Sequence, residues 1–168
     1  MANQVKINAG TAVLFGSEVG DDVAWSTESI GTGAGRQSAM LDLGAVPRAK
    51  FYRFRFWTQF QATPTLGSLL RLYAKTGGSE TATPDHPDND DGTGDIAISA
   101  EDKLRNLRQI GNVVVDQAAA NIEMVISGTI EITERHVAFA FWNASGATVT
   151  ADAAETKLRL TPVLDEIQ

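Results

Sequence analysis

The sequence predicts an all-β fold, an antiparallel β-sandwich of the jelly-roll type with one long acidic loop and at most one short helix. Three observations lead to this prediction. Hydrophobic and polar residues alternate with period two in several segments, which is typical of strands with one buried face. Turn-forming residues separate these segments, and the 168 residues suffice for a single core. We therefore expect one domain over 1–168, with a short N-terminal arm over about 1–10.

The clearest strand lies in "YRFRFWTQF", where Tyr52, Phe54 and Phe56 share one parity and Arg53 and Arg55 the other. A helix would spread these aromatic residues around its circumference, whereas a strand places them on one face. Four more segments alternate in the same way and predict strands: "LGSLLRLYAKT" from Leu66, "IEMVISGTIEI" from Ile122, "HVAFAFW" from His136 and "TKLRLTPVL" from Thr156.

Weaker patterns complete the predicted sandwich. Five further strands are expected at 11–15, 22–26, 37–43, 96–99 and 113–116. Turn signals occur at 31–35, 75–78 and 143–146, where glycine, asparagine and serine tolerate positive φ. One short helix is a candidate, because Ser99 and Asp102 resemble a capping pair and Leu104, Leu107 and Ile110 follow at three-residue spacing. The same segment could equally be extended.

Charge is unevenly distributed along the chain. The segment 77–102 contains eight acidic residues and no Lys or Arg, so it carries −8; the remainder carries +1, because the whole chain carries −7. An acidic protein without a basic stripe is not expected to bind nucleic acid. No stretch approaches the ~18 apolar residues of a membrane span, so no membrane partner is expected. The absence of cysteine and of a visible signal peptide fits synthesis in a reducing cytoplasm.

The acidic stretch "PDHPDNDDGTGD" at 84–95 does not match an EF-hand, because no register gives both the ligand at position 1 and the glutamate at position 12. We interpret it as a solvated loop without a bound metal. The alternative is a looser calcium site in which Asp88, Asp90 and Asp91 are joined by a carboxylate from another loop.

Catalytic signals are weak, so we expect neither an enzyme nor a cofactor. Of the two histidines, His86 lies in the acidic loop and His136 starts a strand, where an exposed or edge position is expected. "GTGAGR" lacks the last glycine of a dinucleotide fingerprint, and no G-x-S-x-G occurs. A glycosidase with two carboxylates in one cleft remains an alternative, but nothing selects a pair. "NAS" at Asn143 is interpreted as a turn and not as a glycosylation site.

The polar face of the aromatic strand predicts a protein interface. Arg53, Arg55 and Trp57 project from the same side, and arginine and tryptophan are enriched at interface hot spots. We expect these three residues, together with the N-terminal arm over 2–10, to contact a partner. The alternative is an ordinary solvated surface.

The C-terminal stretch "ERHVAFAFWNASGATVTADAAETKLRLTPVLDEIQ" resembles the end of small structural proteins of tailed bacteriophages, in which a strand, an Asn-containing turn and a Thr/Ala-rich stretch precede a closing strand. The resemblance implies a head decoration (cement) protein or a related jelly-roll virion protein. It also implies a homotrimer on the capsid exterior that clamps neighbouring major capsid subunits, and synthesis in a host bacterium. The acidic insertion has no counterpart in that pattern.

A rival hypothesis is a carbohydrate- or receptor-binding β-sandwich of a phage tail. In that case, exposed Trp57, Tyr73 or Trp142 would serve as stacking platforms and the aspartate-rich loop as a calcium site.

Overall fold

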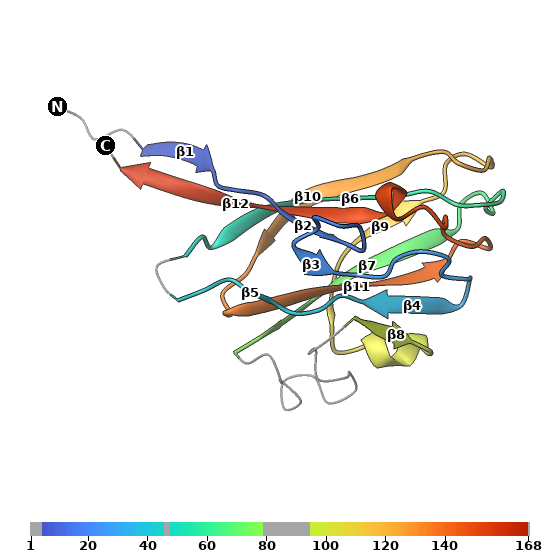
Figure 1. The fold of residues 1–168 in the computed structure, drawn as a ribbon, viewed down its shortest axis with the longest axis horizontal. Helices are drawn as coiled ribbons and strands as arrows, with labels where there is room; N and C mark the ends of the chain where they lie inside the picture. Colours follow the sequence, from blue (N-terminus) through green and yellow to red (C-terminus); the bar gives the residue numbers. More distant parts are fainter. Residues whose placement is uncertain (1–4, 46–47, 79–94, 168) are drawn as a thin grey trace.

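The computed structural model describes residues 5–45, 48–78 and 95–167, which form two β-sheets packed face to face (Figure 1). Sheet A contains β1 (Val5–Ala9), β2 (Val13–Gly16), β3 (Val23–Ala24), β6 (Phe51–Thr58), β10 (Met124–Glu131) and β12 (Lys157–Ile167). Sheet B contains β4 (Ala34–Gln37), β5 (Leu41–Asp42), β7 (Leu69–Gly77), β8 (Ile96–Ile98), β9 (Arg108–Val114) and β11 (His136–Ala144). Two short 3₁₀ turns, η1 (Glu101–Leu104) and η2 (Ala153–Glu155), are the helical elements.

The strand order is that of a jelly roll. Sheet A runs β10-β6-β12-β2-β3 and sheet B runs β8-β4-β11-β7-β9, so that most successive strands of the chain alternate between the sheets. The last strand, β12, lies between β6 and β2 and pairs antiparallel with both. Only the short β2–β3 pair is parallel among the described ladders. The predicted antiparallel β-sandwich is therefore confirmed.

The core lies between the two sheets, and aromatic rings dominate it. Phe56 from β6 and Phe141 from β11 meet across the sandwich with a centroid distance of 6.2 Å, and Trp25 packs on both at 5.8 and 5.6 Å. All three side chains are fully buried, and the indole of Trp25 donates a hydrogen bond to the carbonyl oxygen of Arg36. The predicted inward parity of β6, with Tyr52, Phe54, Phe56 and Thr58 buried, is confirmed.

The outer face of sheet B is covered by the chain segment that follows the acidic stretch. Ile98, Leu104 and Leu107 pack there in a second apolar cluster with Tyr73 and Trp142. Asp95 anchors the start of this segment, because its carboxylate accepts hydrogen bonds from the Ser26 amide and the Arg36 guanidinium. Consequently β11 is buried on both faces.

Burial in sheet B overturns two expectations. Tyr73 and Trp142 are only 7% and 6% exposed, so the hypothesis that they are stacking platforms is wrong. His136 was expected to be exposed or at an edge, but it is buried at the start of β11, which lies in the middle of sheet B. Alternation along one strand cannot show whether a later segment returns to cover its second face.

The weaker strand predictions were less exact at their boundaries. The segment 37–43 contains the end of β4 and the separate strand β5, and the strand predicted at 113–116 begins five residues earlier, at Arg108. The strand predicted from Leu66 begins at Leu69, and Leu66 itself is 60% exposed. The helix candidate is reduced to η1, after which the chain becomes extended in β9.

A two-stranded ribbon projects from one end of the sandwich (Figure 1). Val5–Ala9 of β1 pairs antiparallel with residues 163–167 of β12, beyond the point at which β12 leaves β6. Much of the segment expected to be an arm is thus already paired with its own chain. Isolated two-stranded ribbons are marginally stable in water, so pairing with β12 alone stabilises the N-terminal segment only weakly.

Candidate interface on the outer face of sheet A

The three predicted interface residues lie on the solvent-facing side of sheet A, where β6 runs between β10 and β12. The strand registers place the outward residues in four rows across β10, β6 and β12, and we call these twelve residues the sheet A face. The rows are Val125–Trp57–Lys157, Ser127–Arg55–Arg159, Thr129–Arg53–Thr161 and Glu131–Phe51–Val163.

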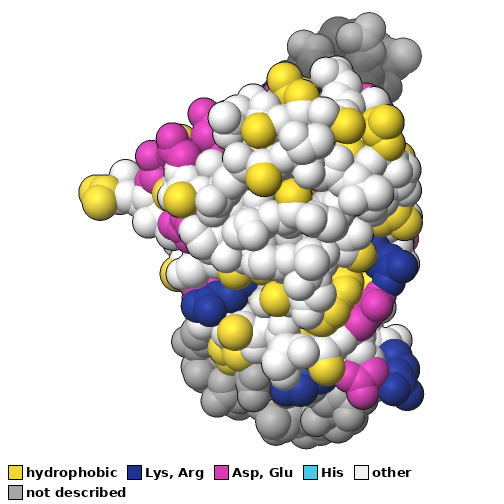
Figure 2. All heavy atoms as spheres, turned by 90° about the vertical axis from the view of Figure 1, so that its right-hand side faces the viewer, with side chains coloured by type: hydrophobic (Ala, Val, Ile, Leu, Met, Phe, Trp, Pro, Cys, Tyr) yellow, Lys and Arg dark blue, Asp and Glu magenta, His cyan; other side chains and the backbone are white. Residues whose placement is uncertain are grey.

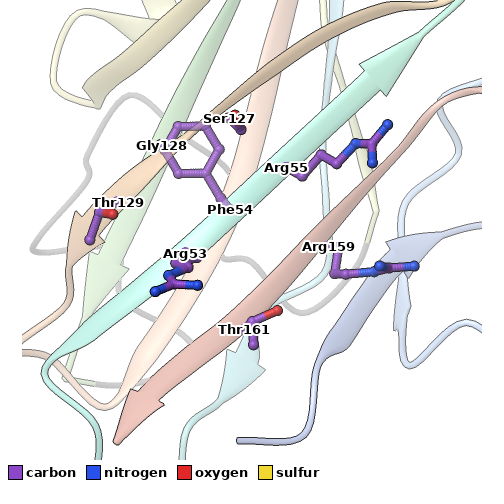
Figure 3. Close-up of a pocket in the computed structure, with 8 residues that line it drawn as sticks. All are labelled: Arg53, Phe54, Arg55, Ser127, Gly128, Thr129, Arg159 and Thr161. Atoms are coloured by element: carbon purple, nitrogen blue, oxygen red, sulfur yellow. The ribbon is translucent and has the colours of Figure 1, made fainter. Parts of the chain in front are cut away.

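Three arginines surround a shallow depression of about 330 Å³ in the two middle rows (Figure 3). Arg53 and Arg55 come from β6, and Arg159 stands directly opposite Arg55 on the neighbouring strand β12. Hydroxyl-bearing side chains complete the lining: Ser127, Thr129 and Thr161. The depression therefore presents hydrogen-bond donors from three strands of one sheet.

The depression also reaches toward the interior, at a glycine. Gly128 of β10 pairs with Phe54 of β6, and both belong to the inward parity of their strands. A Cβ atom at Gly128 would lie 2.9 Å from the Phe54 ring, so the ring occupies the space that a side chain would fill. Phe54 and Gly128 thus line the depression from below the arginines.

The arginines are unequally neutralised. A guanidinium nitrogen of Arg55 lies 3.4 Å from a carboxylate oxygen of Glu123, and its guanidinium carbon lies 6.0 Å from the Trp57 ring centroid. Arg53 and Arg159 are exposed, and they form no ion pair with the described residues. Like charges directly opposite one another on a sheet are destabilising, so the Arg55–Arg159 pair costs folding free energy.

Lys157, the lysine of the first row, does not present a solvent-exposed ammonium group on this surface. Lys157 is buried, and its ammonium group donates hydrogen bonds to Glu18 and to Asp21, the latter at 2.9 Å. Burial disfavours the charged form, but the hydrogen bonds that the ammonium group donates to the two carboxylates outweigh it and raise the pKa of Lys157 above its ordinary value. The positive charge of the sheet A face is therefore concentrated in the arginines.

Apolar side chains lie at both ends of the arginine rows. Trp57 and the exposed Val125 pair at one end, and the exposed Phe51 pairs with Val163 at the other. The Trp57 indole is half-buried and donates a hydrogen bond of 3.2 Å to the carbonyl oxygen of Ala154, which fixes its orientation. The face therefore has arginines and hydroxyls in its two middle rows, and apolar side chains together with Lys157 and Glu131 in its two end rows.

The loop end of the sandwich offers a contrast. Figure 2 shows that end with a largely uncharged surface, on which hydrophobic side chains are scattered and the charged side chains lie toward the margins. Single exposed hydrophobic residues are normal on soluble proteins and need no functional explanation.

Sequence reasoning found part of this face and missed part. It grouped Arg53, Arg55 and Trp57, which the structure places side by side along β6, and their role as an interface stays a prediction. It missed Arg159, although the alternation around Leu158 and Leu160 already directed that residue outward. Its position opposite Arg55 depends on the β6–β12 register, which no local pattern shows.

Asp88, Asp90 and Asp91, like His86, lie outside the described residues. Within the described ranges, no group of three or more His, Asp or Glu side chains could hold a metal ion. The same ranges contain no helix of the length and hydropathy that a membrane crossing needs.

Comparisons with known proteins give a likeness in architecture. No protein-family model matches the chain, and no curated protein sequence matches it. Murine APRIL at pH 5.0 is 10% identical over 96% of this chain and 99% of its own, with a TM-score of 0.46. TmCBM61, solved with β-1,4-galactotriose, is 8% identical over 98% of this chain and 88% of its own, with a TM-score of 0.30.

A bacteriophage protein is also among the similar structures. The enzymatically active domain of tailspike protein 4 of bacteriophage CBA120 is 10% identical over 99% of this chain and 19% of its own, with a TM-score of 0.28. At these identities and scores the likenesses concern the β-sandwich architecture, and we infer no site or activity from them. By fold and surface, the chain is a jelly-roll β-sandwich with an arginine-bearing sheet face.

Proposed function

We propose that this protein is a non-enzymatic structural protein of a virion, a capsid decoration (cement) protein whose sheet A face docks on neighbouring major capsid subunits. The observation that supports the proposal most directly is the pair of exposed arginines, Arg53 and Arg159, without an ion-pair partner among the described residues, beside the fixed indole of Trp57. The resemblance of 134–168 to phage structural proteins supplies the identity of the proposed partner.

The ordered backbone of the sheet A face suits docking on a capsid. Its side chains stand on three antiparallel strands with continuous registers, so binding requires little ordering of the backbone. Arginine and tryptophan at the centre of a contact carry much of the binding free energy in protein interfaces. Many copies on one shell would add these modest contacts together, and a homotrimer would present three faces at once.

The proposal is tested on particles produced by the genome that encodes this chain. We expect peptides of the protein in purified, DNA-filled heads, and a lower DNA-release temperature for particles that lack it. The Arg53→Ala/Arg159→Ala variant should be depleted from heads, whereas Arg105→Ala should be retained, because Arg105 is equally cationic but lies beside η1 on the sheet B side. Absence of the wild-type protein from heads would refute the proposal.

A second candidate is a carbohydrate- or receptor-binding module of a phage tail, favoured by the hydroxyls of Ser127, Thr129 and Thr161 around the depression. Because Tyr73 and Trp142 are buried, Trp57 is the one remaining aromatic platform of the three first considered. Labelling with an antibody would separate the two candidates: signal on the tail together with glycan binding would favour this alternative, and signal over the head would favour decoration.

A further inference from the structure

We propose that the depression on the sheet A face binds an extended acidic segment of the partner protein, with carboxylates at alternate positions. This inference rests on the proposed function in one respect, that the sheet A face is the docking face. It adds the chemistry of the partner and the spacing of the groups that are recognised.

The first argument is an uncompensated charge. Arg55 and Arg159 stand directly opposite on β6 and β12, with Arg53 in the next row, and Glu123 is the carboxylate found near them, at 3.4 Å from Arg55. Three arginine side chains line this one depression, and such a cluster of like charges is unusual on a protein whose net charge is −7. An anionic ligand would neutralise these charges. Local conflicts of this kind are expected at functional sites.

The second argument is the donor geometry. Arg55 shares its row with the Ser127 hydroxyl, and Arg53 has the Thr129 and Thr161 hydroxyls on its two sides. Guanidinium groups bind carboxylates through two parallel hydrogen bonds, and neighbouring hydroxyls can donate further ones. Each of the two rows can therefore hold one carboxylate.

The third argument is spacing. Arg53 and Arg55 are two residues apart on one strand, so the two rows are separated by about 6.7 Å. Alternate side chains on an extended segment have the same separation and point to the same side, whereas consecutive side chains point to opposite sides. An extended segment aligned with β6 would therefore satisfy both rows when its acidic residues alternate.

The ends of the face favour a polypeptide over other polyanions. Val125 and Trp57 lie beyond the Arg55 row, and Phe51 and Val163 lie beyond the Arg53 row, so apolar side chains flanking an acidic pair would be covered. Glu131 shares the row of Phe51, and its carboxylate pairs with Lys50 at 2.9 Å. Nucleic acid would need a longer basic stripe than two rows. A sugar ring would need an aromatic platform within the depression, and Trp57 lies one row outside it with its indole N–H already bonded to Ala154.

Peptide binding to the full-length protein tests the inference. The probes are two fluorescein-labelled ten-residue peptides with five Glu and five Thr: one alternating, ETETETETET, and one with the glutamates in adjacent pairs, EETTEETTET, in which no two glutamates are two residues apart. We expect fluorescence anisotropy at low salt to show that the alternating peptide binds at least fivefold more tightly than the other peptide. Its affinity should fall as the salt concentration rises. Arg53→Ala and Arg159→Ala should each weaken binding of the alternating peptide about tenfold, since each removes a charge-assisted contact. Arg105→Ala is the matched control and should leave the affinity for the alternating peptide unchanged.

Several results would overturn the inference. Equal binding of the two peptides would show that spacing is not recognised, and no binding by the folded wild-type protein would show that the site does not take acidic peptides. Tighter binding of dextran sulfate or of a DNA oligonucleotide, compared at equal charge, would assign the depression to another polyanion. Self-association of this chain in sedimentation that Arg53→Ala and Arg159→Ala both abolish would make a second copy the occupant of the depression.

The outcome can be separated from that of the proposed function. If the alternating peptide binds through Arg53 and Arg159 but the protein is absent from heads, the acidic-segment site stands and the virion assignment fails. If the protein is found in heads and the Arg53→Ala/Arg159→Ala variant is retained there, the docking face is elsewhere and this inference fails. Urea unfolding of each variant shows whether a loss of binding reflects a loss of folding.

Discussion

Lys157 and Asp21 form an ion pair between the final strand and the β2–β3 turn, with 2.9 Å between Nζ and Oδ1 and side chains only 8% and 5% exposed. The ammonium group also contacts Glu18, whose side chain is 44% exposed. The turn is further held by the Glu18 amide, which donates a hydrogen bond to the other carboxylate oxygen of Asp21. This connection joins the β2–β3 turn to β12 beside the sheet A face.

Removing the buried carboxylate should destabilise the protein strongly. In Asp21→Ala the Lys157 ammonium group stays largely buried with one exposed partner, and breaking a buried ion pair by removing one member costs about 3 kcal/mol. Glu18→Gln is the control, for which we expect a loss below about 1 kcal/mol because its carboxylate is exposed. Urea midpoints of the two variants measure the difference; a Glu18 variant less stable than the Asp21 variant would contradict this assignment.

The same lysine predicts loss of stability in alkali. The pKa of Lys157 is higher in the folded protein than in the unfolded chain, so its contribution is fully present below the unfolded pKa of about 10.5 and is lost as pH rises through the folded value. The urea midpoint should therefore fall above about pH 10.5. Lys157→Met should flatten this decline, and an unchanged alkaline profile in that variant would assign the decline to other groups.

Asp42 predicts a stability change in acid. Hydrogen bonds from the Arg135 guanidinium, at 2.7 and 2.5 Å, and from the Gly44 amide lower the pKa of Asp42 below its ordinary value of 3.8. Its contribution is present above the unfolded pKa and is lost as pH falls below about 3.8 toward the folded value. We expect Asp42→Asn to unfold with a shallower dependence on pH between 4 and 2 (about the range where carboxylates protonate) than the wild type. Identical acid profiles would refute this.

Gly128 should not tolerate a side chain. In Gly128→Ala the new Cβ atom would lie 2.9 Å from the Phe54 ring, and overpacking of this kind costs about 1–3 kcal/mol. Gly78→Ala is the control, since no atom of the described residues lies within 4 Å of its added Cβ atom. Thermal unfolding compares the two variants, and equal melting temperatures would show that the Phe54 ring moves aside at no cost.

Asn143 should be needed for the turn after β11. Its side-chain amide is fully buried and donates hydrogen bonds to the carbonyl oxygens of Ile30 and Ala147, while its oxygen accepts from the backbone and side chain of Ser145. Asn143→Asp replaces the donor by a carboxylate that faces two carbonyl oxygens, so we expect a loss of about 3 kcal/mol by urea unfolding. A stable Asp variant would show that the turn rearranges. The interpretation of "NAS" as a turn was inexact, because Asn143 and Ala144 are the last residues of β11 and the turn begins at Ser145.

Local patterns predicted the strands, and the direction of their side chains, where one face of the strand is buried and the other is exposed to solvent. In β6 and β10 this condition holds, so period two alone separated Phe54 from Arg53 and Ile130 from Thr129. The condition fails in β11, which is buried on both faces, and there alternation did not predict that Trp142 is covered.

The sequence by itself determined that the chain is a β-sandwich, that Arg53, Arg55 and Trp57 face one way, and that the negative charge is concentrated in one segment. Only the tertiary structure decided which strands are neighbours, and so placed Arg159 opposite Arg55 and Thr161 opposite Arg53. It also decided that Ile98, Leu104 and Leu107 close over Tyr73 and Trp142. The physical reason is that strand register and layer packing join residues more than a hundred positions apart, while alternation records only whether a side chain points toward a core.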